Sequence, residues 1–85
     1  MNLTERKIGT MLILVEKSSP SIGKLNNLLS SFGKFILSRQ GLSFKDRQYN
    51  LITIVFEAEI NEINSFAGKI GRLPGIKVKL IVVKP

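Results

Sequence analysis

A glycine–lysine step near the end of the chain is the first place where residue types suggest chemistry. Residues 68–71 read GKIG. In nucleic-acid-binding KH domains a GxxG loop joins two helices, and its backbone lies against the nucleotides, so a helix must restart after the loop. Here Pro74 and Gly75 follow, and they indicate a turn instead. We therefore predict that the step ends a helix, with Gly71 as its left-handed terminal residue.

A second group of residues that could bind an anion lies in the middle of the chain. Basic residues alternate there with Gly41 and Phe44. They could face an anionic ligand across a subunit boundary, or they could form a charged edge strand and hairpin that prevent unwanted strand pairing. The predicted effector-binding residues are Arg39, Gly41, Phe44 and Arg47.

The composition argues against catalysis and metal binding. The chain has no cysteine and no histidine, and its six acidic residues are scattered along the sequence. Thiolate and imidazole chemistry is thus excluded, and no pair of carboxylates is visible for acid–base work. We expect no enzyme activity, no metal site and no cofactor. The net charge of +7 favours acidic partners, either a small anionic effector or nucleic acid.

The elements that position these residues follow a β-α-β-β-α-β order. Ser19 is a suitable N-cap for the first helix, and Gly33 is a suitable residue to end it. Right-handed crossovers joined by a hairpin give an α+β, ferredoxin-like sandwich. Its four-stranded antiparallel sheet carries both helices on one face, and strands one and three are central. Strands are predicted at residues 7–16, 34–42, 50–57 and 75–84, and apolar residues at helical spacing predict helices from about 20 to 32 and from about 60 to 70.

The chain is predicted to be one domain. Residues 1–6 are polar and are expected to form a flexible tail, which leaves residues 7–85 for the domain. The longest wholly apolar run, residues 11–15, is too short to span a membrane, so we expect a soluble, cytoplasmic protein.

The strands are apolar on both faces, although two helices can cover only one. In the first strand Ile8, Leu12 and Leu14 alternate with a second apolar set. An exposed apolar face on so small a chain favours association with another subunit. The alternative is that central strands are simply hydrophobic and are partly covered by the tails. The predicted oligomer face consists of Met11, Ile13, Val15, Leu51 and Val55.

Three segments resemble a known family in their order and spacing. They are KIGTMLILVEKSSPSIGKLNNLLSSFG, ILSRQGLSF and EINSFAGKIGRLPGIKVK. Together they are similar to the iron-only hydrogenase system regulators over residues 6–84. Residues 68–79 fit that family's pattern G-K-[LI]-G-x-[LI]-x-G-[VI]-K-V-K. The resemblance implies an ACT-like, ferredoxin-like domain over residues 7–85, similar to the ligand-sensing domain of the nickel-responsive repressors.

The resemblance also implies association between subunits and a small effector held between them. Residues 39–44 read RQGLSF, whereas the family has R-M-G-[IL]-P-Y, so the effector or its affinity is expected to differ here. Nickel sensing does not carry over, because its histidine and cysteine ligands are missing.

The sequence thus predicts a non-enzymatic, oligomeric ACT-like regulatory module, a dimer or tetramer that binds a small anionic effector at a subunit interface. Its family label connects it with regulation, including transcription regulation, through a protein partner. The alternatives are a weak, basic nucleic-acid-binding protein and a structural interaction protein without a ligand. The nucleic-acid alternative lacks a recognisable reading helix or an aromatic stacking surface.

Overall fold

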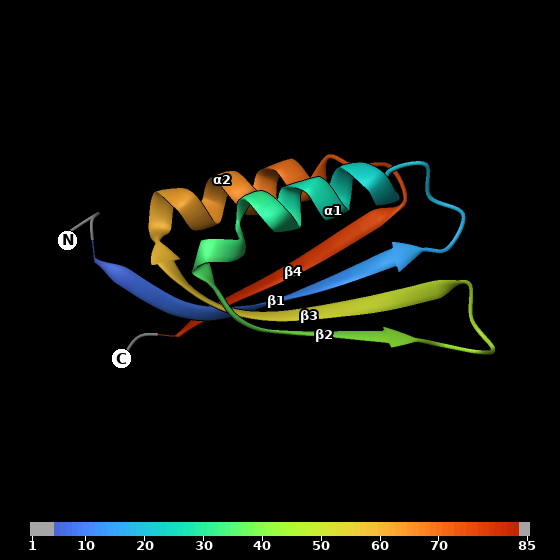
Figure 1. Cartoon of the computed structure of the whole chain (residues 1–85), viewed down its shortest axis with the longest axis horizontal. Coiled ribbons are helices and arrows are strands. Elements are labelled where there is room, and N and C mark those ends of the chain that lie inside the picture. Colours follow the sequence, from blue (N-terminus) through green and yellow to red (C-terminus); the bar gives the residue numbers. More distant parts are fainter. Residues whose placement is uncertain (1–4, 84–85) are drawn as a thin grey trace.

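The computed structural model describes residues 5–83 (Figure 1). Residues 1–4 of the predicted tail and Lys84 of the predicted last strand lie outside this range. The first strand already begins at Arg6. The elements in chain order are β1 (Arg6–Glu16), α1 (Ile22–Ser31), the 3₁₀ turn η1 (Gly33–Phe35), β2 (Ile36–Ser43), β3 (Tyr49–Glu59), α2 (Ile60–Gly71) and β4 (Ile76–Val83).

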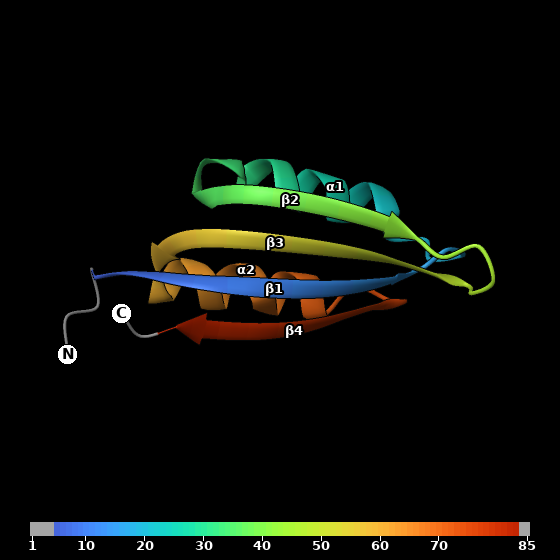
Figure 2. The same ribbon diagram turned by 90° about the horizontal axis from the view of Figure 1, so that it is seen from below.

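The sheet confirms the predicted ferredoxin-like fold. Its strand order is β2-β3-β1-β4 and every neighbouring pair is antiparallel, so β1 and β3 are central as expected. Both helices cover the same face of the sheet (Figure 1), and the view from below shows the other face with no helix in front of it (Figure 2). We call these the helix face and the open face.

The helix ends differ in detail from the sequence-based expectation. The first helix begins at Ile22 with Ser21 as its N-cap residue, and Ser19 acts one step earlier, where its Oγ accepts a hydrogen bond from the Ser21 N–H at 3.0 Å. After the helix, the chain makes the 3₁₀ turn η1, because the N–H of Phe35 bonds back to the carbonyl of Phe32 at 2.9 Å. Strand β2 therefore starts at Ile36, two residues later than predicted.

The left-handed residue is not where the sequence suggested. Gly71 is the last residue of α2, and Arg72 after it keeps a right-handed helical conformation. Among residues 5–83 the positive φ falls at Gly75, at 77°. The prediction that the glycine–lysine step ends a helix is confirmed, but the turn that needs glycine comes four residues later, where the chain enters β4.

The core lies between the helix face and the two helices. Side chains of β1 and β3 meet those of α1 and α2 there, and the ring of Phe32 at the end of α1 stacks on Phe66 of α2 with centroids 4.0 Å apart. The ring of Phe56 meets Phe32 edge-on at 6.0 Å. This aromatic group holds the two helices against β3.

Three residues of the predicted oligomer face belong to this core. Met11, Ile13 and Val15 are 0%, 0% and 3% exposed beneath the helices, so their assignment to an open surface is wrong. Leu51 and Val55 do lie on the open face, since the register pairs them with Leu14 and Thr10. Both residue sets of β1 are apolar, and alternation within one strand does not tell which set faces the helices.

The loops at one end of the sheet are tied together by hydrogen bonds. The hydroxyl of Ser19 donates to the carbonyl of Pro74 at 2.7 Å, and the N–H of Glu16 donates to the carbonyl of Gly75 at 2.9 Å. On the other side, the N–H of Lys17 donates to the carbonyl of Gln48 at 2.9 Å. The β1–α1 loop is thus joined to both the α2–β4 turn and the β2–β3 connection.

Candidate functional site

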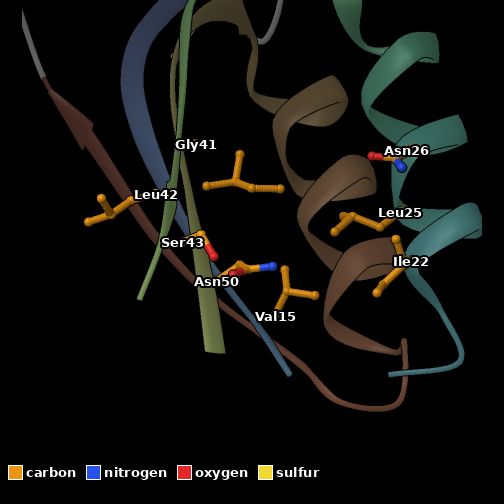
Figure 3. Close-up of a pocket in the computed structure, with 9 residues that line it drawn as sticks. Val15, Ile22, Leu25, Asn26, Gly41, Leu42, Ser43 and Asn50 are labelled. Carbon is orange, nitrogen blue, oxygen red and sulfur yellow. The ribbon is translucent and has the colours of Figure 1, made fainter. Parts of the chain in front are cut away.

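A cavity opens between α1 and the edge of the sheet formed by β2 and β3 (Figure 3). Its volume is about 320 Å³, which is at the lower end of the range for small-molecule sites. It lies within one chain and needs no second subunit to form its walls. The lining residues are Val15, Ile22, Leu25, Asn26, Gly41, Leu42, Ser43, Asn50 and Ile52.

The cavity exists because β2 carries no side chain at the point where α1 passes over it. Gly41 pairs with Ile52 and so lies on the helix face, and a Cβ built there would meet no atom within 4 Å. The next residue, Leu42, points its side chain away from the cavity toward the open face (Figure 3). A larger residue in place of Gly41 would fill part of this space.

The cavity wall is apolar except for two amides and a hydroxyl. Asn26 comes from α1, Ser43 from the end of β2 and Asn50 from the start of β3, and none of the lining residues is charged. The Oδ1 atom of Asn50 is buried and has no hydrogen-bond partner among residues 5–83. Such a wall offers apolar contact and neutral hydrogen bonds.

Of the four predicted effector-binding residues, Gly41 alone lines this cavity. Arg39 lies two residues earlier on β2, where its pairing with Ile54 places it on the same face as Gly41, but it is exposed and outside the cavity wall. Phe44 and Arg47 belong to the β2–β3 connection, and the carbonyl of Phe44 accepts a hydrogen bond from Lys17 Nζ at 2.6 Å.

Sequence reasoning missed the amides that line the cavity. Asn50 offers a signal that could have been used, because it is polar and shares its side of β3 with Ile52, Ile54 and Phe56. A polar residue at a core-facing position needs either a partner or a ligand. No comparable signal marks Asn26, since α1 carries asparagine at two successive positions.

The open face is a second candidate surface. Opposite residues of an antiparallel pair lie on one face, so the register assigns alternate residues of all four strands to it. Thr10 on this face donates its hydroxyl to the carbonyl of Ile54 at 2.9 Å, which reduces its polarity. The aliphatic residues of the open face are Ile8, Leu12, Leu14, Leu42, Leu51, Val55, Ile81 and Val83.

Charges surround this aliphatic surface. Lys77 and Lys79 of β4 lie beside Leu14 and Leu12, and Glu57 lies beside Ile8. Among residues 5–83, one ion pair forms within 4 Å, between Lys7 Nζ and Glu5 Oε2 at 3.4 Å, so these three charged side chains form none. The open face therefore combines aliphatic side chains with two central threonines, Thr10 and Thr53, and with charged residues beside them.

Two other kinds of feature are absent from the described residues. Within residues 5–83, no three acidic side chains come together in a way that could hold a metal ion. In the same range, no helix has the length and apolar character that crossing a bilayer requires; the longer one, α2, has 12 residues.

Comparisons with known proteins point to one family. The family model described as “TM1266-like: Iron-only hydrogenase system regulator, putative” matches residues 7–80. The solved structure of the uncharacterized protein TM1266 from Thermotoga maritima is similar to this chain with a TM-score of 0.90 and 28% sequence identity. The match covers 94% of this chain and 100% of that one. No curated protein matches the sequence.

Proposed function

The chain belongs to the TM1266-like family of iron-only hydrogenase system regulators, and on this premise we propose that it is a non-enzymatic ACT-like regulatory module. It works as a homo-oligomer, binds a small effector, and transmits its state of binding to a protein partner. The family description speaks of regulation. The cavity wall has no charged residue and no pair of groups suited to acid–base or nucleophilic chemistry.

The open face is the observation that carries this proposal. Five of its aliphatic side chains are more than a third exposed in the single chain, and Ile81 and Val83 reach 55%. Exposed aliphatic side chains on an uncovered sheet face are characteristic of a surface that another protein covers. A second copy of the chain is the simplest partner, since a twofold axis brings the same face of both copies together.

The outline of the chain is compatible in size with a dimer interface. The Cα atoms extend over 43 × 18 Å in the view that shows the sheet from below (Figure 2). That outline corresponds to a surface on the order of 800 Å², which is what each partner buries in an interface of standard size.

The effector is proposed to bind along β2, beside the cavity. Arg39 is exposed on the helix face next to Gly41, and Arg47 is exposed in the following connection. No carboxylate of residues 5–83 lies within 4 Å of either guanidinium. An anionic group of the effector would meet these arginines, whose planar donors suit carboxylates and phosphates.

One pair of variants tests the assembly. Leu12→Asp puts a charge in the middle of the open face, whereas Ile22→Asp puts the same charge on α1 in the other layer. The two side chains are 38% and 39% exposed, and an acidic residue suits the first turn of a helix. Light scattering coupled to size exclusion should show that Leu12→Asp is a monomer and that Ile22→Asp keeps the wild-type mass. Assembly that survives Leu12→Asp would refute the assigned face.

A further inference from the structure

The wall of the cavity between α1 and the β2–β3 edge includes a side chain with an unpaired hydrogen-bond acceptor. Asn50 Oδ1 is buried and has no partner among residues 5–83, although it belongs to a side chain on the cavity wall (Figure 3). A buried polar atom left without a partner is costly, and such atoms are uncommon in native proteins. The position is therefore suited to a ligand that completes the hydrogen bonding.

The chemistry of the amide restricts what that ligand can be. A primary amide presents one acceptor and one N–H₂ donor side by side. A ligand with adjacent N–H and C=O groups can pair with both, and it matches in either orientation of the amide. The buried Oδ1 would meet a ligand once the amide turns about its terminal torsion, which is broad for asparagine.

The rest of the wall excludes a charged group from the interior. Val15, Leu25 and Ile52 supply aliphatic surface, and the remaining polar groups are the neutral Asn26 and Ser43. A charge moved into such a space without a countercharge loses its hydration and gains little. The nearby Arg39 lies outside the wall, so a negative charge on the ligand would remain at the rim.

We propose that this cavity binds an uncharged, largely apolar ring system carrying a lactam-type N–H and C=O pair that hydrogen-bonds to the side-chain amide of Asn50. The volume of about 320 Å³ accommodates two fused rings. This ligand class refines the effector of the proposed function, on which it rests, by specifying the part of the molecule that enters the protein.

Two isosteric compounds test the hydrogen bond. 2-Quinolinone has the N–H and C=O pair, and coumarin has the same rings and carbonyl with an oxygen in place of the N–H. Binding to the full, ¹⁵N-labelled chain is followed by shifts of the backbone amides of Asn26, Gly41 and Asn50. We expect 2-quinolinone to bind roughly tenfold more tightly than coumarin, because coumarin leaves the buried acceptor unpaired. Equal affinities, or no shifts with 2-quinolinone at millimolar concentration, would overturn the proposal.

Variants show whether the compounds occupy this cavity. Asn50→Leu should bring the affinity for 2-quinolinone down to that for coumarin, while Asn27→Leu, the same change at an exposed position outside the wall, should leave both affinities unchanged. Gly41→Val introduces a residue that strands favour, and its side chain fills the space in which a Cβ meets no other atom. This variant should therefore abolish binding of both compounds. Undiminished binding to Gly41→Val would place the ligand elsewhere and refute the site.

A charged compound tests the second part of the proposal. 2-Naphthoate has a similar ring system and a carboxylate in place of the lactam pair. Its charge would remain at the rim near Arg39, so we expect Arg39→Ala to weaken its binding and to leave that of 2-quinolinone unchanged. Binding of 2-naphthoate that is lost in Gly41→Val but unchanged in Arg39→Ala would place the carboxylate inside the cavity and contradict an uncharged interior. The mass in solution is measured on the same samples. Failure of the probes in a chain that still assembles would reject this ligand class alone, while a monomer that binds them would reject the proposed assembly alone.

Discussion

At the scale of single residues, Gly9 shows how closely the centre of the sheet is packed. It lies on the helix face of β1 opposite Phe56, whose ring occupies the space where a side chain would be. A Cβ at this position would stand 2.7 Å from that ring and 2.5 Å from the carbonyl oxygen of Ile81. The ring could move by changing its rotamer, but the backbone oxygen belongs to a paired strand and could not.

Gly9→Ala is therefore expected to destabilise the protein by about 2 kcal/mol, the usual cost of overpacking a well-filled core. Urea denaturation followed by circular dichroism measures the change. Gly68→Ala is the matched control, because a Cβ there meets nothing and alanine is preferred to glycine inside a helix by up to about 1 kcal/mol. An unchanged midpoint for Gly9→Ala would mean that the close contact between β1 and β4 is not present.

Some residue assignments followed from the sequence and others did not. Gly75 after Pro74 was recognised as a turn from residue type alone, since the pair is a strong turn signal. The left-handed position was misplaced to Gly71, because a helix end and a turn four residues later are both suitable for glycine. The role of Gly41 depends on the distance between β2 and α1, and the residues around Gly41 in the sequence do not indicate that distance.

At the scale of the elements, one buried hydroxyl adds to the backbone hydrogen bonds that join the loops at the end of the sheet. Ser19 is 8% exposed, donates to the Pro74 carbonyl and accepts from the Ser21 N–H. It thereby fixes the start of α1 against the turn that leads into β4. The first turn of α1 carries Ile22, so this connection also helps to set the width of the cavity.

We expect Ser19→Ala to cost about 2 kcal/mol, because the buried Ser21 N–H and the part-buried Pro74 carbonyl would both lose their hydrogen bond. Ser18→Ala, an exposed change in the same loop, should stay within about 0.5 kcal/mol of the wild type. Hydrogen exchange adds a local measure, since the first turn of α1 should lose protection in Ser19→Ala and keep it in Ser18→Ala. Equal stability of the two variants would show that the hydroxyl does not hold the loops together.

The order of the elements was predicted correctly, whereas the side of β1 that faces the helices was assigned wrongly. The β-α-β-β-α-β order leaves few compact arrangements, so the strand order followed from general rules of connection. The alternation in β1 is apolar on both sides, and its relation to β3 is known only once the register is known. A useful signal was overlooked. Each central strand has one threonine among its aliphatic residues, Thr10 in β1 and Thr53 in β3. The polar residue marks the side of the strand that faces away from the core, and the register places both threonines on the open face.

At the scale of the whole molecule, the net charge and the open face suggest different partners. A charge of +7 attracts nucleic acid in general, but recognition of single strands uses exposed aromatic rings. Phe32, Phe56 and Phe66 are buried in the core, whereas Tyr49 at the start of β3 is 36% exposed. One exposed ring beside eight aliphatic side chains is a poor stacking platform, so the open face favours a protein partner over a nucleic acid.

The mass of the wild-type protein in solution tests the central claim most directly. The chain has a mass of 9.5 kDa, and its open face carries five aliphatic side chains that are more than a third exposed. Light scattering coupled to size exclusion, over a dilution series in the micromolar range at moderate salt, should give a dimer or a higher multiple of this mass. A mass of one chain at every concentration would contradict the account, because the aliphatic face would then be exposed without a second copy to cover it.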